Sequence, residues 1–302
     1  MREIFRITVA LTISCLIAAL VMGAVNTITD KAKRHNEHLN IQETMLGLLG
    51  YGKANPAPSD LEFYNIYRYI IEDGETKTLG YMLPVAAGGK AAYELVVIDL
   101  AGQFVGRFSL DITPEGASEP SERKSALESV LKPPKRFIYA DSTVIAKLGD
   151  RRLAYLLPGE FPGFKTFIHV MLALDPSFTI LGLDITEHEE DPGLGAEIEQ
   201  GYFKNQFKGK SFQKIKELTV IKEPLPEEYK RYLEPDKGEP IPKGEVDTIR
   251  SIYMDKDIYA LTGATISSKS VTEGVKNMIK KFAYRINLLG NIIERQHIPV
   301  AF

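Results

Sequence analysis

One uncharged run near the N-terminus constrains this chain more than any other feature of its sequence. It extends over 22 residues from Ile7 to Ile28 and reads ITVALTISCLIAALVMGAVNTI. As a helix rising about 1.5 Å per residue, the run is long enough to cross a hydrocarbon layer about 30 Å thick. A signal peptide usually has an apolar core of about 7–15 residues and a small side chain three positions before the cut, where a cut after Ala24 would place Met22. We therefore predict a retained membrane anchor.

The rest of the composition is that of an ordinary globular protein. The 302 residues are 44% hydrophobic and 25% charged, and 37 basic against 40 acidic side chains give a net charge of −3. This balance predicts no nucleic-acid partner, because nucleic-acid-binding domains usually present an excess of basic residues. The single cysteine, Cys15, lies inside the uncharged run, which argues against an internal disulfide, thiol catalysis and a cysteine-rich metal site. The run also continues past Cys15, unlike the short apolar segment of a lipoprotein.

Charges on both sides of the run give opposing topological signals. Arg2 and Arg6 precede it, and Lys31, Lys33 and Arg34 follow it. The positive-inside rule therefore does not orient the helix.

Turn-forming residues suggest how the chain is divided. We expect an anchor over residues 1–34 and a helical connector over 35–60, which ends in the sequence YGKANPAPSD. Short alternating apolar runs then dominate residues 61–302, which we expect to form one domain. The predicted class is α+β, with an antiparallel or mixed sheet and flanking helices.

Two hairpin-like segments of this domain resemble each other. Tyr93–Thr113 and His169–Thr186 each read as strand, turn and strand, with Asp99 and Asp175 at the turns, and each ends in the sequence LDIT. Coincidence between two hairpins is one explanation. The identical ending makes an internal duplication of a sheet-forming unit at least as good an explanation.

The remaining segments predict flanking elements. Glu122–Leu131 reads as a short helix, and Ala140–Leu157 as one or two strands. Pro224–Gly244 contains five prolines and many charges, so we expect a surface excursion that adds little to the core and could contact a partner. Val271–Leu289 has apolar residues at helical spacing, and we expect this helix to begin after a loop over 262–270.

The sequence LTGATISSKS, which precedes the predicted helix, favours an anion. Gly263 would let the main chain approach a ligand closely, and four hydroxyl side chains surround it, those of Thr262, Thr265, Ser267 and Ser268. The N–H groups and dipole at a helix start favour phosphate. The alternative is structural, because Ser and Thr are also common as helix N-caps.

A second segment, EHEEDPGLG, directly follows the second LDIT sequence. The turn Pro192–Gly195 contains two glycines, which permit close approach of a flat ligand to the main chain. A metal site formed by His188, Glu189, Glu190 and Asp191 is the alternative. Neighbouring side chains point in different directions and cannot all reach one ion, so we predict a ligand-lining role and no metal.

The combination of one N-terminal span, the sequence HEEDPGLG followed by FKNQFKGK, and TGATISS before a terminal helix resembles a known family. It resembles the FMN-binding G subunit of the Rnf electron-transport complex and is similar to the C subunit of the sodium-translocating NADH:quinone reductase. The resemblance implies that FMN is joined through its phosphate to the hydroxyl of Thr265. By the same resemblance, the phosphate side consists of Thr262, Gly263, Ala264, Ile266 and Ser267, and the isoalloxazine side of His188, Glu189, Pro192, Gly193, Leu194 and Gly195.

The chain departs from the family pattern at two positions. The family usually has Asp six residues before the modified threonine, where this chain has Tyr259, with Asp257 two residues earlier. The family also usually has Thr before the Pro-Gly-Leu-Gly turn, where this chain has Asp191. The first change bears on recognition by a flavin transferase, and the second replaces a possible hydrogen-bond donor by an acceptor.

The resemblance implies a membrane-anchored electron carrier in an ion-translocating ferredoxin:NAD⁺ oxidoreductase complex. Its partners would be the other membrane subunits and, during maturation, a flavin transferase. The domain would lie on the outer face of the cytoplasmic (inner) membrane, and no residue would act as a catalytic acid or base because the flavin performs the redox chemistry. The alternatives are a subunit of the quinone reductase and a membrane-tethered scaffold without flavin. A serine hydrolase using Ser267 or Ser268 is disfavoured, since the chain contains no G-x-S-x-G sequence.

Overall fold

The computed structural model describes residues 2–87, 90–235, 237 and 240–302, without the side chains of 24, 26–28, 30–38, 87, 90 and 91. The chain divides into two compact units, Met1–Gly47 and Leu48–Phe302. The first unit consists of helix α1, Arg2–Leu48, which runs without a break past the expected boundary at residue 34. Its segment Arg2–Gly23 has a mean hydropathy of 2.3 and no buried residues, so its length and composition suffice to cross a membrane.

The second unit contains an eight-stranded sheet in the order β4-β3-β2-β1-β5-β6-β7-β8, in which every neighbouring pair is antiparallel. A separate two-stranded parallel pair joins β9 to β10. The predicted α+β class with an antiparallel or mixed sheet is therefore confirmed. The strands are β1 Leu61–Asp73, β2 Thr76–Ala87, β3 Lys90–Asp99, β4 Phe104–Leu110, β5 Arg136–Leu148, β6 Arg151–Pro162, β7 Phe167–Leu174, β8 Ile180–Glu187, β9 Val220–Ile221 and β10 Ile258–Tyr259.

The large sheet consists of two four-stranded meanders, β1–β4 and β5–β8, that meet where β1 pairs with β5. The two similar hairpins lie at opposite ends of the sheet. In both turns an Asp N–H donates to the carbonyl four residues later and its Oδ1 accepts the N–H of that residue, at Asp99 with Gln103 and at Asp175 with Thr179. The third residue after each Asp has a positive φ, 83° at Gly102 and 65° at Phe178. A duplicated unit would produce this agreement.

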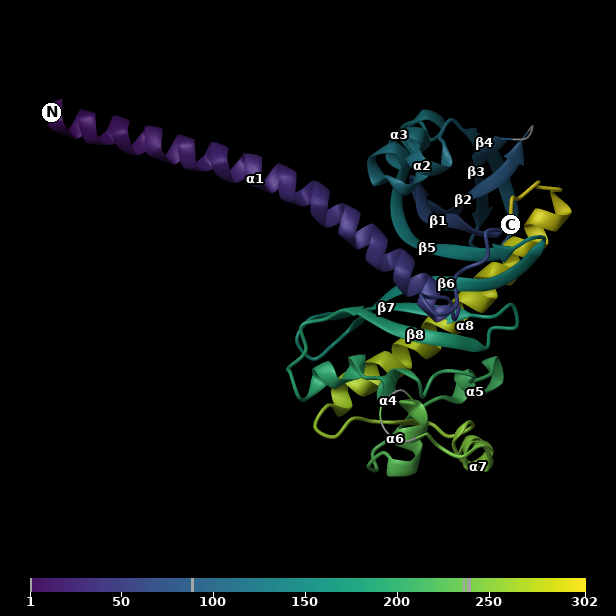
Figure 1. Cartoon of the computed structure of the whole chain (residues 1–302). Helices are drawn as coiled ribbons and strands as arrows, with labels where there is room; N and C mark the ends of the chain where they lie inside the picture. Colours follow the sequence, from purple (N-terminus) through teal and green to yellow (C-terminus); the bar gives the residue numbers. More distant parts are fainter. Residues whose placement is uncertain (1, 88–89, 236, 238–239) are drawn as a thin grey trace. The chain divides into compact units, whose positions relative to one another are not determined.

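Helices cover both faces of the sheet (Figure 1). Because neighbouring side chains of a strand point to opposite faces, Ile66 joins the core beneath α8, whereas Tyr67 and Tyr69 join the core that includes Leu127 of α3. The helical elements of this unit are α2 Pro114–Ser118, α3 Pro120–Val130, a 3₁₀ helix Gly195–Glu199, α4 Gly201–Lys204, α5 Phe212–Glu217, α6 Glu227–Leu233, α7 Lys243–Tyr253 and α8 Thr265–Arg295.

Two expectations need correction. The terminal helix α8 begins at Thr265, so Ile266–Ser270 belong to the helix and not to a loop. Serine and threonine favour caps and turns over helix interiors, which is why the segment reads as a loop, but here buried hydroxyls bond within the helix. The excursion Pro224–Gly244 also contributes to a core, because α6 buries Tyr229 and Leu233 against α7.

Candidate functional site

The candidate site is built around the start of α8. β10 leads into a tight turn in which the N–H of Ala264 donates to the carbonyl of Leu261 at 3.0 Å. Gly263 has a φ of 78°, a conformation that glycine adopts without strain. Thr265 follows as the first residue of α8, and its side chain is exposed. The chain therefore presents a hydroxyl at the positive end of a 31-residue helix.

The hydroxyl side chains of this segment divide between inside and outside. Ser268 is buried, where its Oγ accepts the N–H of Leu261 at 3.0 Å and donates to the carbonyl of Ala264 at 2.9 Å. Thr262 and Thr265 are exposed. The N-cap position is Ala264, and no side chain caps this helix. The structural alternative, in which the threonines cap α8, is therefore wrong.

Glu190 joins three segments that are distant in sequence. Its side chain is buried, with 5% exposed, and it accepts the N–H of Phe164 at 2.7 Å and the N–H of Lys165 at 3.2 Å. Its second oxygen accepts the hydroxyl of Ser267 on the first turn of α8. The loop between β6 and β7, the segment after β8 and the start of α8 are thereby held together at one carboxylate.

The glycine-rich turn lies against the threonine loop. A Cβ atom on Gly263 would lie 2.8 Å from Cδ2 of Leu194, so the two predicted sides of the site are in direct contact. Leu194 is 47% exposed, Ile266 is 59% exposed, and Phe164 is 62% exposed. These three apolar side chains come from the three segments that meet at Glu190, and they leave apolar surface beside Thr265 open to solvent.

The other residues predicted for the ring side have different environments. His188 is largely buried, its Nδ1 accepts the N–H of Glu190 at 3.0 Å, and its Nε2 lies 2.8 Å from a carboxylate oxygen of Glu199 without the alignment of a hydrogen bond. Glu189, Pro192 and Gly193 are exposed. Gly195 is buried against the carboxylate of Glu190, where a side chain would not fit.

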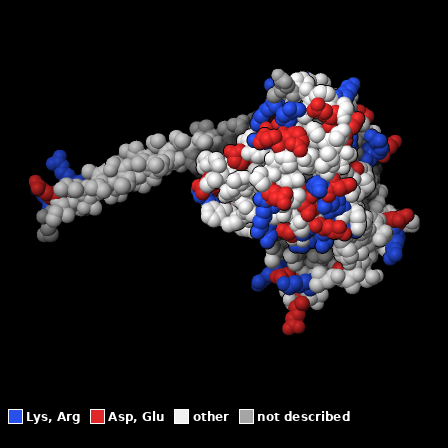
Figure 2. Space-filling view, turned by 90° about the horizontal axis from the view of Figure 1, so that it is seen from below, with Lys and Arg blue, Asp and Glu red and all other residues white. Residues whose placement is uncertain are grey.

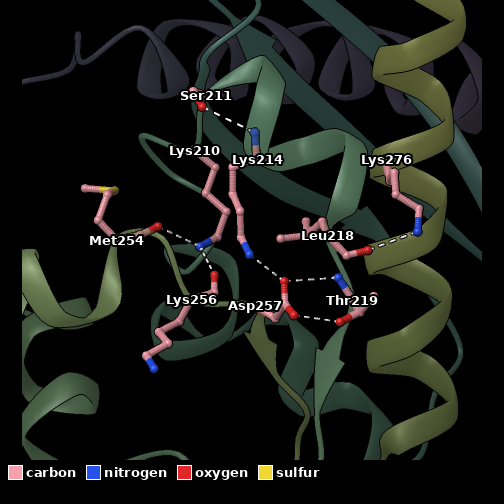
Figure 3. A network of polar contacts seen from close by, with 9 residues as sticks. All are labelled: Lys210, Ser211, Lys214, Leu218, Thr219, Met254, Lys256, Asp257 and Lys276. Atoms are coloured by element: carbon pink, nitrogen blue, oxygen red, sulfur yellow. Dashed lines mark hydrogen bonds and ion pairs between the residues drawn. The ribbon is translucent and has the colours of Figure 1, made fainter.

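The sequence FKNQFKGK positions the strand that leads into the site. Phe203 and Phe207 are fully buried. The amide of Gln206 accepts the N–H of Tyr259 at 2.8 Å and donates to its carbonyl at 3.2 Å. Lys210 donates to the carbonyls of Met254 and Lys256 at 3.0 and 2.6 Å (Figure 3). The segment thus fixes the main chain on both sides of Asp257, a few residues before the threonine loop.

Two charged groups that hold this segment, Lys210 and Asp257, have shifted pKa values. Lys210 is 2% exposed, and burial, together with repulsion from Lys214, lowers the pKa of its ammonium group to about 8. Burial alone would raise the pKa of Asp257, but hydrogen bonds from Lys214 and Thr219 hold it below its usual value (Figure 3). Asp257 is therefore occupied by structural contacts.

Tyr259, at the position where the family usually has Asp, is 7% exposed. It packs edge-on against Tyr229 and Tyr253, whose rings stack with centroids 4.4 Å apart. Asp191, the second departure, forms a salt bridge of 2.5 Å with Lys165. Both departures thus have local partners in the structure.

Sequence reasoning missed Glu190, Gln206 and Lys210 as residues that build the site. The sequence predicts Glu190 only as an alternative metal ligand. The run EHEED contains no Lys or Arg and precedes two glycines, and this pattern is a possible signal of a buried acceptor. Gln206 and Lys210 lie beyond the end of α4, in a segment without regular secondary structure, so no periodic pattern in the sequence identifies them.

Comparisons with known proteins agree with the resemblance predicted from the motifs. Residues 163–280 match the family described as the FMN-binding domain, and this range contains Glu190 and Thr265. The chain is 33% identical over 136 residues to the G subunit of a proton-translocating ferredoxin:NAD(+) oxidoreductase complex of Clostridium ljungdahlii, which covers 45% of this chain and 57% of the relative. It is 29% identical over 124 residues to the G subunit of a Na(+)-translocating ferredoxin:NAD(+) oxidoreductase complex of Acetobacterium woodii, covering 41% and 46%.

Among solved structures, the chain is similar to the C subunit of the Na(+)-translocating NADH-quinone reductase of Parabacteroides distasonis. The identity is 25%, the TM-score is 0.30, and the similarity covers 45% of this chain and 57% of that one. The chain spans about half the length of the curated relatives it matches. Residues 163–280 thus match an FMN-binding domain, and the chain is similar in sequence to Rnf-type G subunits.

Proposed function

We propose that this protein is a membrane-anchored electron-carrier subunit that holds FMN covalently, through a phosphoester to the hydroxyl of Thr265. One observation supports this most strongly: the exposed Thr265 hydroxyl stands on the uncapped first turn of α8, beside the exposed Leu194 and Ile266. A phosphate and a flat apolar ring are the two parts of FMN, and both kinds of surface are present within a few residues.

The residues present fit the phosphate. The first N–H groups of a helix have no partner within it, and in α8 no side chain caps them. The positive φ of Gly263 turns the loop so that Thr262 and Thr265 both remain exposed. A phosphoester at Thr265 would therefore meet main-chain donors and the positive end of the helix dipole.

The residues also fit an isoalloxazine ring. Gly193 and Gly195 have no side chains that would keep a flat ring away from the main chain of the turn, and Leu194 and Ile266 offer apolar contacts. Glu190 does not face the ring, since its two oxygens already accept three hydrogen bonds within the protein. Its role is to hold the two sides of the site in register.

FMN would supply the one- and two-electron chemistry, and the protein would position it and exclude water from part of the ring. This role would require no side chain to act as a catalytic acid or base. A covalent link is physically sensible on the outer face of a membrane, because a dissociated cofactor would be lost to the surroundings.

We propose that α1 anchors the domain in the cytoplasmic membrane, with the domain on the outer face. The partners would be other membrane subunits of an ion-translocating ferredoxin:NAD⁺ oxidoreductase complex of the Rnf type, and a flavin transferase would attach the cofactor. The relatives named as subunits of such complexes support this assignment. Figure 2 shows acidic and basic side chains interspersed over one face of the domain, without the broad basic field expected for a nucleic-acid partner.

The test is the colour of the purified full-length protein after expression with a flavin transferase. We expect flavin absorbance that remains with the polypeptide after denaturation and removal of small molecules. Absorbance that is lost on denaturation would contradict the covalent link. A colourless native protein would contradict the carrier role and favour the scaffold without flavin.

A further inference from the structure

The large sheet opens between β5 and β6, the fifth and sixth of its eight strands. The pairing of β5 with β6 begins where Leu148 is paired with Arg151 and ends where Val144 is paired with Leu156. Beyond that point, residues 136–143 of β5 pair only with β1, and residues 157–162 of β6 pair only with β7. These two stretches, all of whose residues belong to the described part of the chain, have no paired residues with each other. We call this opening the β5–β6 fork.

The divergence of β5 has a local cause. Its pairing with β1 shifts register next to Arg68, where Tyr139 and Asp141 are paired and Ala140 is the extra residue. Such a bulge bends a strand and increases its twist. Figure 1 shows β5 curving away from β6 toward α3. The inner edge of β5 is therefore free to pair with another strand, as at the edge of a sheet, whereas Pro158 and Pro162 leave the open stretch of β6 without main-chain N–H donors at two positions.

The fork is the mouth of a cleft of about 760 Å³. α8 forms its floor, because the ring of Phe161 lies against Gly274, Met278 lies against Gly159, and Arg285 binds Asp141. Both arms of the fork thus contact the same helix. The residues that line the cleft are Tyr139–Thr143 from β5, Leu157–Phe161 from β6, Arg68, His169, Gly274, Asn277, Met278, Lys281 and Arg285.

The charged groups of the cleft leave donors for a further acceptor. Asp141 accepts Nε and Nη2 of Arg68 at 2.9 and 2.6 Å, and Nη1 of Arg285 at 2.9 Å. Burial would raise the pKa of Asp141, but the two guanidinium groups hold it below its usual value, so the carboxylate stays ionised. A guanidinium carries five N–H donors, and one carboxylate does not satisfy two of them.

The net charge of the side chains that line the cleft is opposite in sign to that of residues 35–302 as a whole. The chain has a net charge of −3 and its first 34 residues contribute +3, so the remainder carries −6. In the cleft, three basic side chains, Arg68, Lys281 and Arg285, face two acidic ones, Asp141 and Glu160. This local excess favours an acidic occupant.

Apolar side chains next to the fork are uncovered. Ile138 is 54% exposed and Tyr139 is 49% exposed, on the unpaired stretch of β5. Natural proteins usually protect such an edge with charges, proline or a covering element, and the open stretch of β6 carries Pro158, Glu160 and Pro162, whereas the open stretch of β5 contains no proline. An open edge with exposed apolar residues is the arrangement to which an extended peptide adds as a strand.

We propose that the β5–β6 fork receives an extended segment of a partner protein, which adds as a strand of about five residues and places a carboxylate side chain on Arg68 and Arg285. Five residues, Tyr139–Thr143, is the length of β5 that lines the cleft. Main-chain hydrogen bonds would supply affinity, and the two arginines would select for the acidic side chain. The floor of the cleft is formed by α8, the helix that begins at Thr265. The partner would therefore be held at a fixed position relative to the start of α8.

The experiment places the photo-crosslinking residue p-benzoylphenylalanine in the full-length protein in its native membranes, at Ala140, at Ser142 or at Glu160. A matched control carries it at Glu128, on the exposed side of α3. Cross-linked peptides are identified by mass spectrometry. We expect all three fork positions to cross-link to one segment of a single other protein, with the contact moving by two residues between Ala140 and Ser142, and no such product from Glu128.

A second variant tests the charge. Arg285→Gln leaves the bidentate Arg68 pair with Asp141 intact, so the fold should be retained, and it should reduce the cross-link at Ser142 about fivefold or more. Unchanged cross-linking would overturn the role of the arginines. Cross-links only within this chain or to a second copy, products scattered over several segments without register, or no product would each overturn the strand-addition proposal. Flavin content, measured on the same samples, reports separately on the proposed function.

Discussion

Ser267, on the first turn of α8, donates a hydrogen bond to the buried carboxylate of Glu190, 77 residues earlier in the chain. This contact joins the two segments that the resemblance assigns to opposite sides of one flavin. Because the same carboxylate also accepts two main-chain N–H groups from the β6–β7 loop, it acts as a common anchor for the site.

Replacing the anchor should destabilise the domain. Glu190→Ala leaves the part-buried N–H groups of Phe164 and Lys165 and the buried hydroxyl of Ser267 without their acceptor, and a buried unsatisfied donor costs about 1–3 kcal/mol. Allowing for partial solvation in the vacated space, we expect the free energy of unfolding in urea to fall by about 2–4 kcal/mol. The control is the exposed neighbour, Glu189→Ala, for which we expect a change within about 0.5 kcal/mol. Equal effects at the two positions would show that Glu190 is no anchor.

The contribution to stability of the contact between Gly263 and Leu194 can be measured separately from that of backbone strain. Gly263 and Gly193 both have positive φ, 78° and 73°, but only at Gly263 would a Cβ atom meet a neighbour, Leu194. Alanine at either position should cost about 1–2 kcal/mol from φ alone. We expect Gly263→Ala to lower the free energy of unfolding more than Gly193→Ala does, and Leu194→Ala to remove that excess in the double variant. An excess that persists without the Leu194 side chain would refute the contact.

The buried ammonium group of Lys210 predicts a pH dependence of stability. Its pKa of about 8 in the folded protein lies below the ordinary value of 10.5, so between these values the unfolded chain binds more protons. Stability should therefore rise with pH from about 8 to 9.5, before the tyrosines titrate in the unfolded chain. We expect Lys210→Met to show a smaller rise in urea-unfolding series across this range. Parallel curves for the two proteins would mean that Lys210 does not titrate there.

Restoring the usual family residue at position 259 should not improve the protein. Tyr259 is buried against Tyr229 and Tyr253, and Asp there would place an unpaired carboxylate among aromatic rings. We expect Tyr259→Asp to lower the free energy of unfolding by at least about 3 kcal/mol and Tyr259→Phe to lower it by less than about 1 kcal/mol. A Tyr259→Asp variant that is as stable as wild type and carries more flavin would indicate that the tyrosine cluster is dispensable.

Local patterns predicted much of this fold. Alternating apolar residues indicated both hairpins, with Asp99 and Asp175 at their turns, and the apolar stripe of the last helix predicted its buried side from Val271 to Leu289. The start of that helix was misplaced because Ser267 and Ser268 favour turns in isolation. Ser268 also bonds to the carbonyl of Ala264, but the bond from Ser267 to Glu190 and the bond from the N–H of Leu261 to Ser268 form only in the folded domain.

Non-local pairing accounts for what the sequence did not reveal. The β5–β6 fork depends on where two strands stop pairing. Pro158 and Pro162 mark an edge on β6 that lacks main-chain donors, but the residues around Thr143 do not show that β5 is the strand that leaves it. Likewise, the role of Gln206 depends on the position of Tyr259, 53 residues later. The motif residues could be recognised from the sequence, whereas the reason for their arrangement required the folded chain.

The most direct test of the central claim is the intact mass of the full-length protein after co-expression with a flavin transferase, for wild type, Thr265→Ala and the neighbouring control Thr262→Ala. We predict a mass increase equal to FMN less one water in wild type and in Thr262→Ala, and none in Thr265→Ala. A wild-type protein without added mass, or an increase that survives in Thr265→Ala, would contradict the covalent link at Thr265.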